Sequence, residues 1–176
     1  MNTSFDPVNH IYKIDNRIVP SVTQICNPDG EAWYTEEAAQ RGTFVHLSCE
    51  LYDRGTLCET TLDPQLRPYL TAWKAYRKHN PEGFSAIEEQ LYSVEHGFAG
   101  TVDRCYFDCV LDIKTGTTFP KWLDVQLGGY SILTRMELGR GVLLMPNGKF
   151  RVQNFGPSQM AQARGKFLAA MERIRS

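Results

Sequence analysis

The chain has no hydrophobic run long enough to cross a bilayer. Its longest obvious apolar run is Val142–Met145, far below the ~20 residues that a membrane-spanning helix needs. The first residues, MNTSFDPVNH, also lack the basic-then-apolar layout of a signal peptide. We therefore expect a cytoplasmic protein that does not bind a membrane.

Cysteine is scarce and badly spaced for metal binding. The five cysteines are odd in number and form no C-x-x-C pair, so we expect neither a disulfide framework nor a four-cysteine zinc or iron–sulfur site. The sequence also lacks internal repeats, low-complexity tracts and linkers. Its 176 residues, with 42% hydrophobic and 22% charged side chains, are typical of a globular chain. We predict a single domain over residues 1–176.

A net charge of −1 conceals an uneven distribution of charge. From Arg135 to the end, eight basic residues face two acidic ones, whereas the first 134 residues carry a net charge of −7. A basic C-terminal part suits a polyanionic partner such as nucleic acid. Solvated lysines and arginines on a surface helix are the alternative explanation.

Turn and capping signals divide the chain into alternating helices and strands. A short hairpin is expected over 10–20 around Asp15-Asn16, followed by a turn or short helix at Ser21. Further helices are expected over 35–54, from Asp63 or Arg67 to about 80, over 119–136 and over 158–174. Strands are expected over 84–93, 98–106, 109–115, 140–146 and 149–155. This order predicts an α/β fold with a central mixed sheet covered by helices.

Two of these boundaries depend on single residues. Ser158 is expected to cap the last helix, because a serine hydroxyl accepts hydrogen bonds from the first helical N–H groups. Asn147-Gly148 between two strands predicts a type I′ hairpin turn.

The segment from residue 100 to 116 contains the most informative charges. If Phe107-Asp108 is a two-residue hairpin loop, Asp103 lies opposite Asp112, with Cβ atoms ~4.5–5.5 Å apart, and Thr101 lies opposite Lys114. Opposed carboxylates repel unless a cation or a shared proton lies between them. Lys114 supplies one positive charge, and oxygen ligands favour Mg²⁺ or Mn²⁺ as a further cation. A solvated surface ion cluster is the alternative, although the apolar neighbours of Asp112 favour a functional site.

Two helical pairs accompany these strands. His46 and Glu50 are four residues apart, hence on one helix face, and Gly42 lies one turn earlier, where it would leave room for a close approach of backbone or ligand. His46 is either a metal ligand or a structural or exposed histidine. Gln126 and Tyr130 share a face of the helix after Lys114, where they could hold a phosphate or a base, or form a packing edge.

Taken together, these residues resemble the PD-(D/E)XK nuclease superfamily, specifically its RecB-type branch of phage exonucleases. The resemblance covers most of the chain and implies a restriction-endonuclease-like core with Mg²⁺ or Mn²⁺ and no iron–sulfur cluster. The motifs that carry it are His10-Ile-Tyr12, Pro20-Ser-Val-Thr23, Arg41-Gly-Thr-Phe-Val-His46 with Glu50, Gly100-Thr-Val-Asp103, Asp112-Ile-Lys114-Thr-Gly116 and Gln126-Leu-Gly-Gly-Tyr130.

The resemblance also implies a role for each matched residue. His46, Asp103, Asp112 and the carbonyl of Ile113 would bind the metal ion. Lys114 would position or activate the attacking water. The strand glutamate of the family corresponds to Glu88, with Glu89 as the alternative.

The implied substrate is DNA. Gln126 and Tyr130 would contact DNA or order the site, and Lys149, Arg151, Arg164 and Lys166 are candidates for sequence-independent contacts with its backbone. The expected function is an exonuclease that processes DNA ends in phage-type recombination or repair, with a recombination or single-strand-binding partner, in a bacterial host cytoplasm if a phage encodes it. Two alternatives are a catalytically inactive DNA-end-binding or recombination-partner module and a structure-specific endonuclease. Polarity, strand preference, metal number and oligomeric state stay open.

Overall fold

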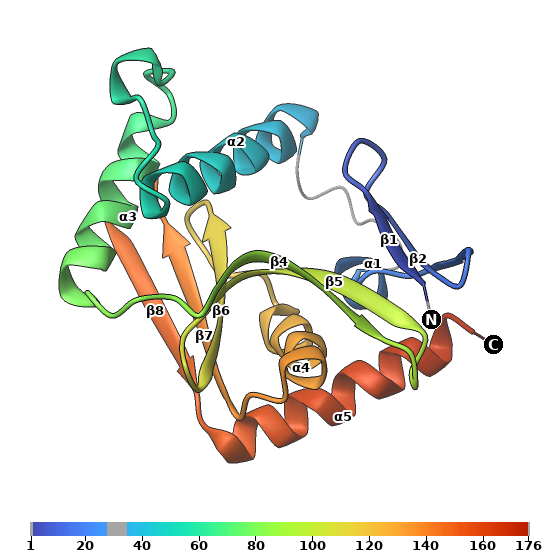
Figure 1. The fold of residues 1–176 in the computed structure, drawn as a ribbon. Helices are drawn as coiled ribbons and strands as arrows, with labels where there is room; N and C mark the ends of the chain where they lie inside the picture. Colours follow the sequence, from blue (N-terminus) through green and yellow to red (C-terminus); the bar gives the residue numbers. More distant parts are fainter. Residues whose placement is uncertain (1, 28–34, 176) are drawn as a thin grey trace.

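The computed structural model describes residues 2–27 and 35–175, and in this part of the chain the strands form two sheets (Figure 1). The smaller sheet is antiparallel and contains β1 (Thr3–Asp6), β2 (Ile11–Ile14) and β3 (Arg17–Val19). The larger sheet contains, in spatial order, β4 (Ala86–Ser93), β5 (Phe98–Cys105), β6 (Cys109–Thr115), β7 (Leu138–Leu144) and β8 (Phe150–Phe155). Among the described residues of this sheet, β6 and β7 pair in parallel and the other neighbouring strands pair antiparallel. The predicted mixed sheet is therefore confirmed.

Helices cover both faces of the larger sheet. The described helices are α1 (Val22–Cys26), α2 (Glu36–Asp53), the 3₁₀ turn η1 (Glu59–Thr61), α3 (Arg67–His79), α4 (Leu123–Thr134) and α5 (Pro157–Arg173). Helices α2 and α3 pack in one core with Leu111, whereas α1, α4 and α5 pack in a second core with Val110. Successive strand residues point to opposite faces, which explains why neighbours on β6 enter different cores. None of the described helices has the length and apolar character needed to cross a membrane.

The starts of α2 and α3 follow from local chemistry. Thr35 caps α2, its hydroxyl accepting the Ala38 N–H at 3.3 Å, and acidic side chains occupy the first turn. Of the two expected starts for α3, the one at Arg67-Pro68 is correct, because proline is tolerated in the first helical turn.

Helix α4 is shorter than the expected 119–136. The residue before a proline avoids helical dihedral angles, so Phe119 stays outside the helix. The Leu123 N–H then bonds to the Pro120 carbonyl at 3.2 Å in a turn, and the helix begins at Leu123.

The prediction that Ser158 caps α5 is wrong. The helix already begins at Pro157, and Gly156 is its N-cap. Proline favours the first helical position, which moves the cap to the residue before it. The Gln159 side chain accepts the Gly156 N–H at 3.0 Å.

The prediction of a type I′ turn at Asn147-Gly148 is also wrong. Gly148 is left-handed with φ 78°, but Asn147 is not left-handed. Pro146 holds φ near −65°, so it becomes the first central residue of a turn in which the Met145 carbonyl accepts the Gly148 N–H at 3.1 Å. In the N-terminal hairpin, by contrast, both Asp15 and Asn16 are left-handed, as a two-residue primed turn requires.

A close helix crossing holds α4 in place. A Cβ atom on Gly128 would lie 2.3 Å from the Ala163 carbonyl oxygen of α5, so only glycine allows the two backbones to approach this far. Helix α4 is thereby fixed against the sheet by α5, with Gln126 and Tyr130 buried.

Candidate active site

The turn between β5 and β6 has the predicted register. Arg104 pairs with Leu111, Cys105 pairs with Val110, and the Tyr106 N–H donates to the Cys109 carbonyl at 2.9 Å. Phe107 and Asp108 are therefore the two loop residues.

Beyond this ladder the two strands separate at the site. Asp103 does not continue the backbone pairing; its Oδ2 accepts the Ile113 N–H at 2.6 Å. Thr101 is not paired with Lys114 in the described ladder, and its hydroxyl lies 2.7 Å from the Tyr12 hydroxyl of the N-terminal sheet. The side chain of Asp103 thus replaces a strand–strand hydrogen bond and is fixed next to Asp112.

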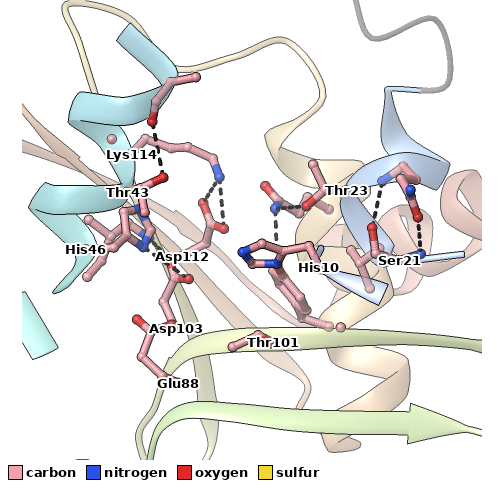
Figure 2. A pocket seen from close by; sticks show the side chains of 18 of the residues that line it. His10, Ser21, Thr23, Thr43, His46, Glu88, Thr101, Asp103, Asp112 and Lys114 are labelled. Carbon is pink, nitrogen blue, oxygen red and sulfur yellow. Dashed lines mark hydrogen bonds and ion pairs between the residues drawn. The ribbon is translucent and has the colours of Figure 1, made fainter. Parts of the chain in front are cut away.

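Three side chains from three elements form a cluster that could hold a metal ion. His46 of α2, Glu88 of β4 and Asp103 of β5 place one donor atom each within 4.8 Å of one another (Figure 2). His46 Nδ1 lies 3.5 Å from Asp103 Oδ1. Glu89 is exposed to solvent, so Glu88 is the glutamate that faces this cluster.

Glu88 has an unusual backbone conformation. Its φ of 50° is left-handed, and β4 pairs with β5 on either side of it, at Ile87 and Glu89. This conformation costs about 1–2 kcal/mol for a residue with a Cβ atom. Strain of this kind is common where a side chain must be aimed at a functional site.

Asp112 and Lys114 form a second pair beside the cluster. Lys114 Nζ donates a hydrogen bond to Asp112 Oδ1 at 3.0 Å and lies 2.8 Å from Oδ2, where the angles are not those of a hydrogen bond. Asp112 is only 1% exposed. The lysine also lies over the Trp122 ring, 5.2 Å from its centroid. Asp112 and its partner Lys114 thus lie beside the three-residue cluster.

The cluster contains an ion pair between His46 and Asp103. Burial lowers the pKa of His46, but the negative charges of Asp103 and Glu88 raise it more, to about 9. Burial raises the pKa of Asp103, but His46, Lys114 and the Ile113 N–H lower it more, so this carboxyl is ionised. A pKa of about 9 favours the protonated His46 imidazole at neutral pH, which places a positive charge beside Asp103.

The other two carboxyls resist ionisation. Burial and the charge of Asp103 raise the pKa of Glu88 to about 7, although His46 and Arg104 oppose this. Burial also raises the pKa of Asp112, to about 6, against the opposing charge of Lys114. Two buried carboxyls and the half-buried Glu88 thus have less positive charge near them than their full ionisation requires. A divalent cation would correct this deficit, so the donor set fits a hard metal ion.

A buried arginine, which the sequence analysis missed, anchors Glu88. Arg104 is fully buried, and it donates to Asp53 Oδ2 at 2.8 Å and to Glu88 Oε1 at 2.9 Å. Asp53 also accepts the Trp73 indole N–H. An arginine in a strand that is otherwise buried requires a carboxylate partner, and this was the signal available in the sequence.

The cluster and the Asp112–Lys114 pair lie in one cleft of about 860 Å³. All the predicted catalytic and metal-binding residues line it, as do Ile113, Glu50, Gln126 and Tyr130. Glu50 is paired with Arg54, whose Nε lies 2.9 Å from its Oε1. The Gln126 amide donates to the Tyr130 hydroxyl at 3.2 Å, while its Oε1 has no hydrogen-bond partner in the described residues.

Gly42 lines the same cleft, but packing does not require a glycine there. An added Cβ atom would meet Thr115 Oγ1 at 3.6 Å, an ordinary contact. The structure thus shows no close backbone approach at Gly42, and the alternative, room for a ligand in the cleft, stays a prediction.

The four basic candidates for DNA contact lie outside the described cleft. Lys149 and Arg151 are exposed at the β8 edge of the sheet, whereas the site lies on β4, β5 and β6. Arg164 donates to the Ser131 hydroxyl at 2.9 Å, and Lys166 pairs with Asp124 at 2.6 Å. Any DNA contact by these four residues would lie outside the cleft that contains His46, Glu88 and Asp103.

The fold is similar to that of solved exonuclease-like structures. One is a candidate exonuclease from Eubacterium rectale, with a TM-score of 0.58 and 11% identity over 89% of this chain and 79% of that one. A second is an alkaline exonuclease from Laribacter hongkongensis, with a TM-score of 0.46 and 11% identity over 88% of this chain and 90% of that one. A third is a phage-related exonuclease from Haemophilus somnus, with a TM-score of 0.46 and 8% identity over 88% of this chain and 92% of that one. No protein-family model and no curated protein sequence matches the chain. At this identity the similarity shows a shared fold, a mixed sheet flanked by helices.

Proposed function

We propose that residues 1–176 form one deoxyribonuclease domain of the PD-(D/E)XK superfamily that depends on Mg²⁺ or Mn²⁺. The observation that carries this proposal is the His46, Glu88 and Asp103 cluster, with Asp112 and Lys114 beside it in the same cleft. The shared exonuclease-like fold supports it. The RecB-type branch, the action on DNA ends and a role in phage-type recombination or repair are part of the proposal and rest on the motifs.

The proposed metal ligands are Glu88, Asp103, Asp112 and the His46 imidazole, with the Ile113 carbonyl as a further candidate. An ion bound there would neutralise charge on a phosphate and make a water molecule more acidic. Loss of the His46 proton would free the imidazole to bind the ion.

The remaining residues position the reactants. The Ile113 N–H holds the Asp103 carboxylate in a fixed orientation, and Arg104 does the same for Glu88. Asp112 holds the Lys114 ammonium at the cleft, where it would donate hydrogen bonds to the attacking water or to the scissile phosphate. Gln126 and Tyr130 would contact the DNA on the α4 side of the cleft.

Cleavage of DNA with and without ends tests this function. End-labelled linear DNA and a closed circle would be incubated with Mg²⁺, Mn²⁺ or EDTA. The protein would be the wild type, Lys114→Ala or, as a control, Lys78→Ala, which changes an exposed lysine of α3 outside the cleft.

We expect the wild type and Lys78→Ala to degrade linear DNA only, with either metal and not in EDTA. Lys114→Ala should be inactive. Nicking of the circle would contradict the exonuclease assignment and indicate an endonuclease. Wild-type protein that cleaves neither DNA with either metal would contradict the nuclease proposal.

A further inference from the structure

The N-terminal sheet contributes a histidine to the cleft. His10 lies in the turn between β1 and β2, and its imidazole reaches into the cleft that contains Asp103, Asp112 and Lys114 (Figure 2). It is exposed to solvent. Its ring packs against the Phe5 ring, 5.5 Å between centroids, and it forms no hydrogen bond with the described residues, so both of its ring nitrogens are available to a ligand.

Hydrogen bonds connect the turn that carries His10 to its neighbours. The Asp6 carboxylate accepts the N–H groups of Val8 at 2.9 Å and Asn9 at 3.2 Å, and it accepts the Asn9 side-chain amide at 2.8 Å. Tyr12, two residues after His10, is hydrogen-bonded to Thr101 of β5. These bonds hold the backbone of the turn next to the strand that carries Asp103.

The turn itself does not need a histidine. His10 has φ 51°, a left-handed conformation that glycine adopts without strain and that asparagine, aspartate and histidine adopt more readily than other residues. Glycine would therefore fit this turn with less strain, and no hydrogen bond within the described residues holds the imidazole. The ring nitrogens are thus free to bind a ligand in the cleft that His10 lines.

The charge balance of the cleft indicates the ligand. Among the described lining residues, the groups that can carry positive charge are His10, His46 and Lys114. His46 and Lys114 are already paired with Asp103 and Asp112. DNA brings further phosphates next to the scissile one, and an imidazole N–H is a donor for their oxygens. On the basis of the proposed function, we propose that His10 binds a DNA phosphate that neighbours the scissile phosphate.

Replacement by glycine separates this role from a structural one. His10→Gly removes the imidazole and the backbone strain together, and His10→Asn keeps a side chain that is too short to reach the same point. Asn16→Gly is the matched control, because Asn16 has φ 63° in the neighbouring β2–β3 turn and does not line the cleft. The readouts are kcat and KM for linear DNA, the melting temperature, and the Kd for a labelled oligonucleotide measured by anisotropy in the inactive Lys114→Ala chain.

We expect both His10 variants to raise KM and Kd about tenfold, the equivalent of one lost hydrogen bond to a charged group. The kcat should stay within about twofold, and the melting temperature should be unchanged or higher. Asn16→Gly should change neither KM nor Kd.

Unchanged KM and Kd in His10→Gly would overturn the proposal. So would a melting temperature that falls by more than about 4 °C together with the affinity, because His10 would then be a structural residue. A wild type that cleaves no DNA would refute the nuclease function alone. The anisotropy measurement would still show whether His10 binds DNA.

Discussion

The strained, half-buried Glu88 makes the stability of the metal-free protein depend on pH. Its ordinary pKa of 4.5 rises to about 7 in the folded protein, because of burial and the charge of Asp103. The folded state therefore holds the proton more tightly than the unfolded chain does. The stability from this proton is fully present below pH 4.5 and is lost as the pH rises through 7.

The size of the effect follows from the two pKa values. These pKa values predict that the unfolding free energy falls by about 2–3 kcal/mol between pH 5 and pH 8. Because the titration of Glu88 is linked to the charge of Asp103, this change in unfolding free energy is an upper value. For a chain of 176 residues it is equivalent to about 5–10 °C in melting temperature.

Glu88→Gln isolates this contribution, since glutamine has the same shape and does not ionise in this range. Melting would be measured in EDTA at pH 5 and pH 8. The melting temperature of Glu88→Gln minus that of the wild type should rise by up to about 10 °C from pH 5 to pH 8. Glu89→Gln, on the exposed neighbour, should differ from the wild type equally at both pH values.

Addition of Mn²⁺ at pH 8 provides the complementary measurement. It should raise the melting temperature of the wild type more than that of Glu88→Gln, because glutamine cannot supply a charged ligand. If the melting temperature of Glu88→Gln minus that of the wild type stays constant or falls from pH 5 to pH 8 in EDTA, the pKa of Glu88 is not raised in the folded protein.

Two further predictions concern the packing behind the site. Arg104→Met should lower the unfolding free energy in denaturant by about 3–5 kcal/mol, because it leaves Asp53 buried and short of positive charge, and adding Asp53→Asn should restore part of this loss. An Arg104→Met chain as stable as the wild type would contradict the role of this ion network. Gly128→Ala should cost about 1–3 kcal/mol, because the added methyl group overlaps the Ala163 carbonyl. Gly165→Ala on α5, where an added Cβ has no neighbour within 4 Å, should instead stabilise the chain by about 1 kcal/mol; equal effects of the two changes would argue against the close crossing.

Much of the fold was predictable because local signals mark its boundaries. Thr35 and Pro68 fixed the starts of two helices, and the two-residue loop at Phe107-Asp108 fixed the register of β5 and β6. The errors arose where neighbouring signals compete, as when Pro146 displaces the turn expected at Asn147-Gly148. Strand β1 was not predicted, because it depends on pairing with β2 rather than on a pattern of its own.

The candidate site was predictable in part. The register placed Asp103, Asp112 and Lys114 near one another, but the approach of His46 and Glu88 depends on how α2 and β4 pack. The Arg104–Asp53 pair joins residues 51 positions apart, a distance that no local pattern spans.

The basic residues show the limit of counting charges. Arg164 and Lys166 contribute to the positive charge of the C-terminal part, yet the structure pairs them with Ser131 and Asp124 on α4. Their partners become visible only when α4 and α5 are packed together.

A calorimetric titration with Mn²⁺ at pH 8 would show whether His46, Glu88 and Asp103 form a metal centre. Metal-free wild type would be compared with Asp103→Asn, which retains an oxygen acceptor for the Ile113 N–H, and with Asp108→Asn in the exposed β5–β6 turn. We predict that the wild type and Asp108→Asn bind Mn²⁺ equally and that Asp103→Asn binds it at least about tenfold more weakly. Absence of Mn²⁺ binding by the wild type, or equal binding by all three proteins, would show that His46, Glu88 and Asp103 do not form a metal centre.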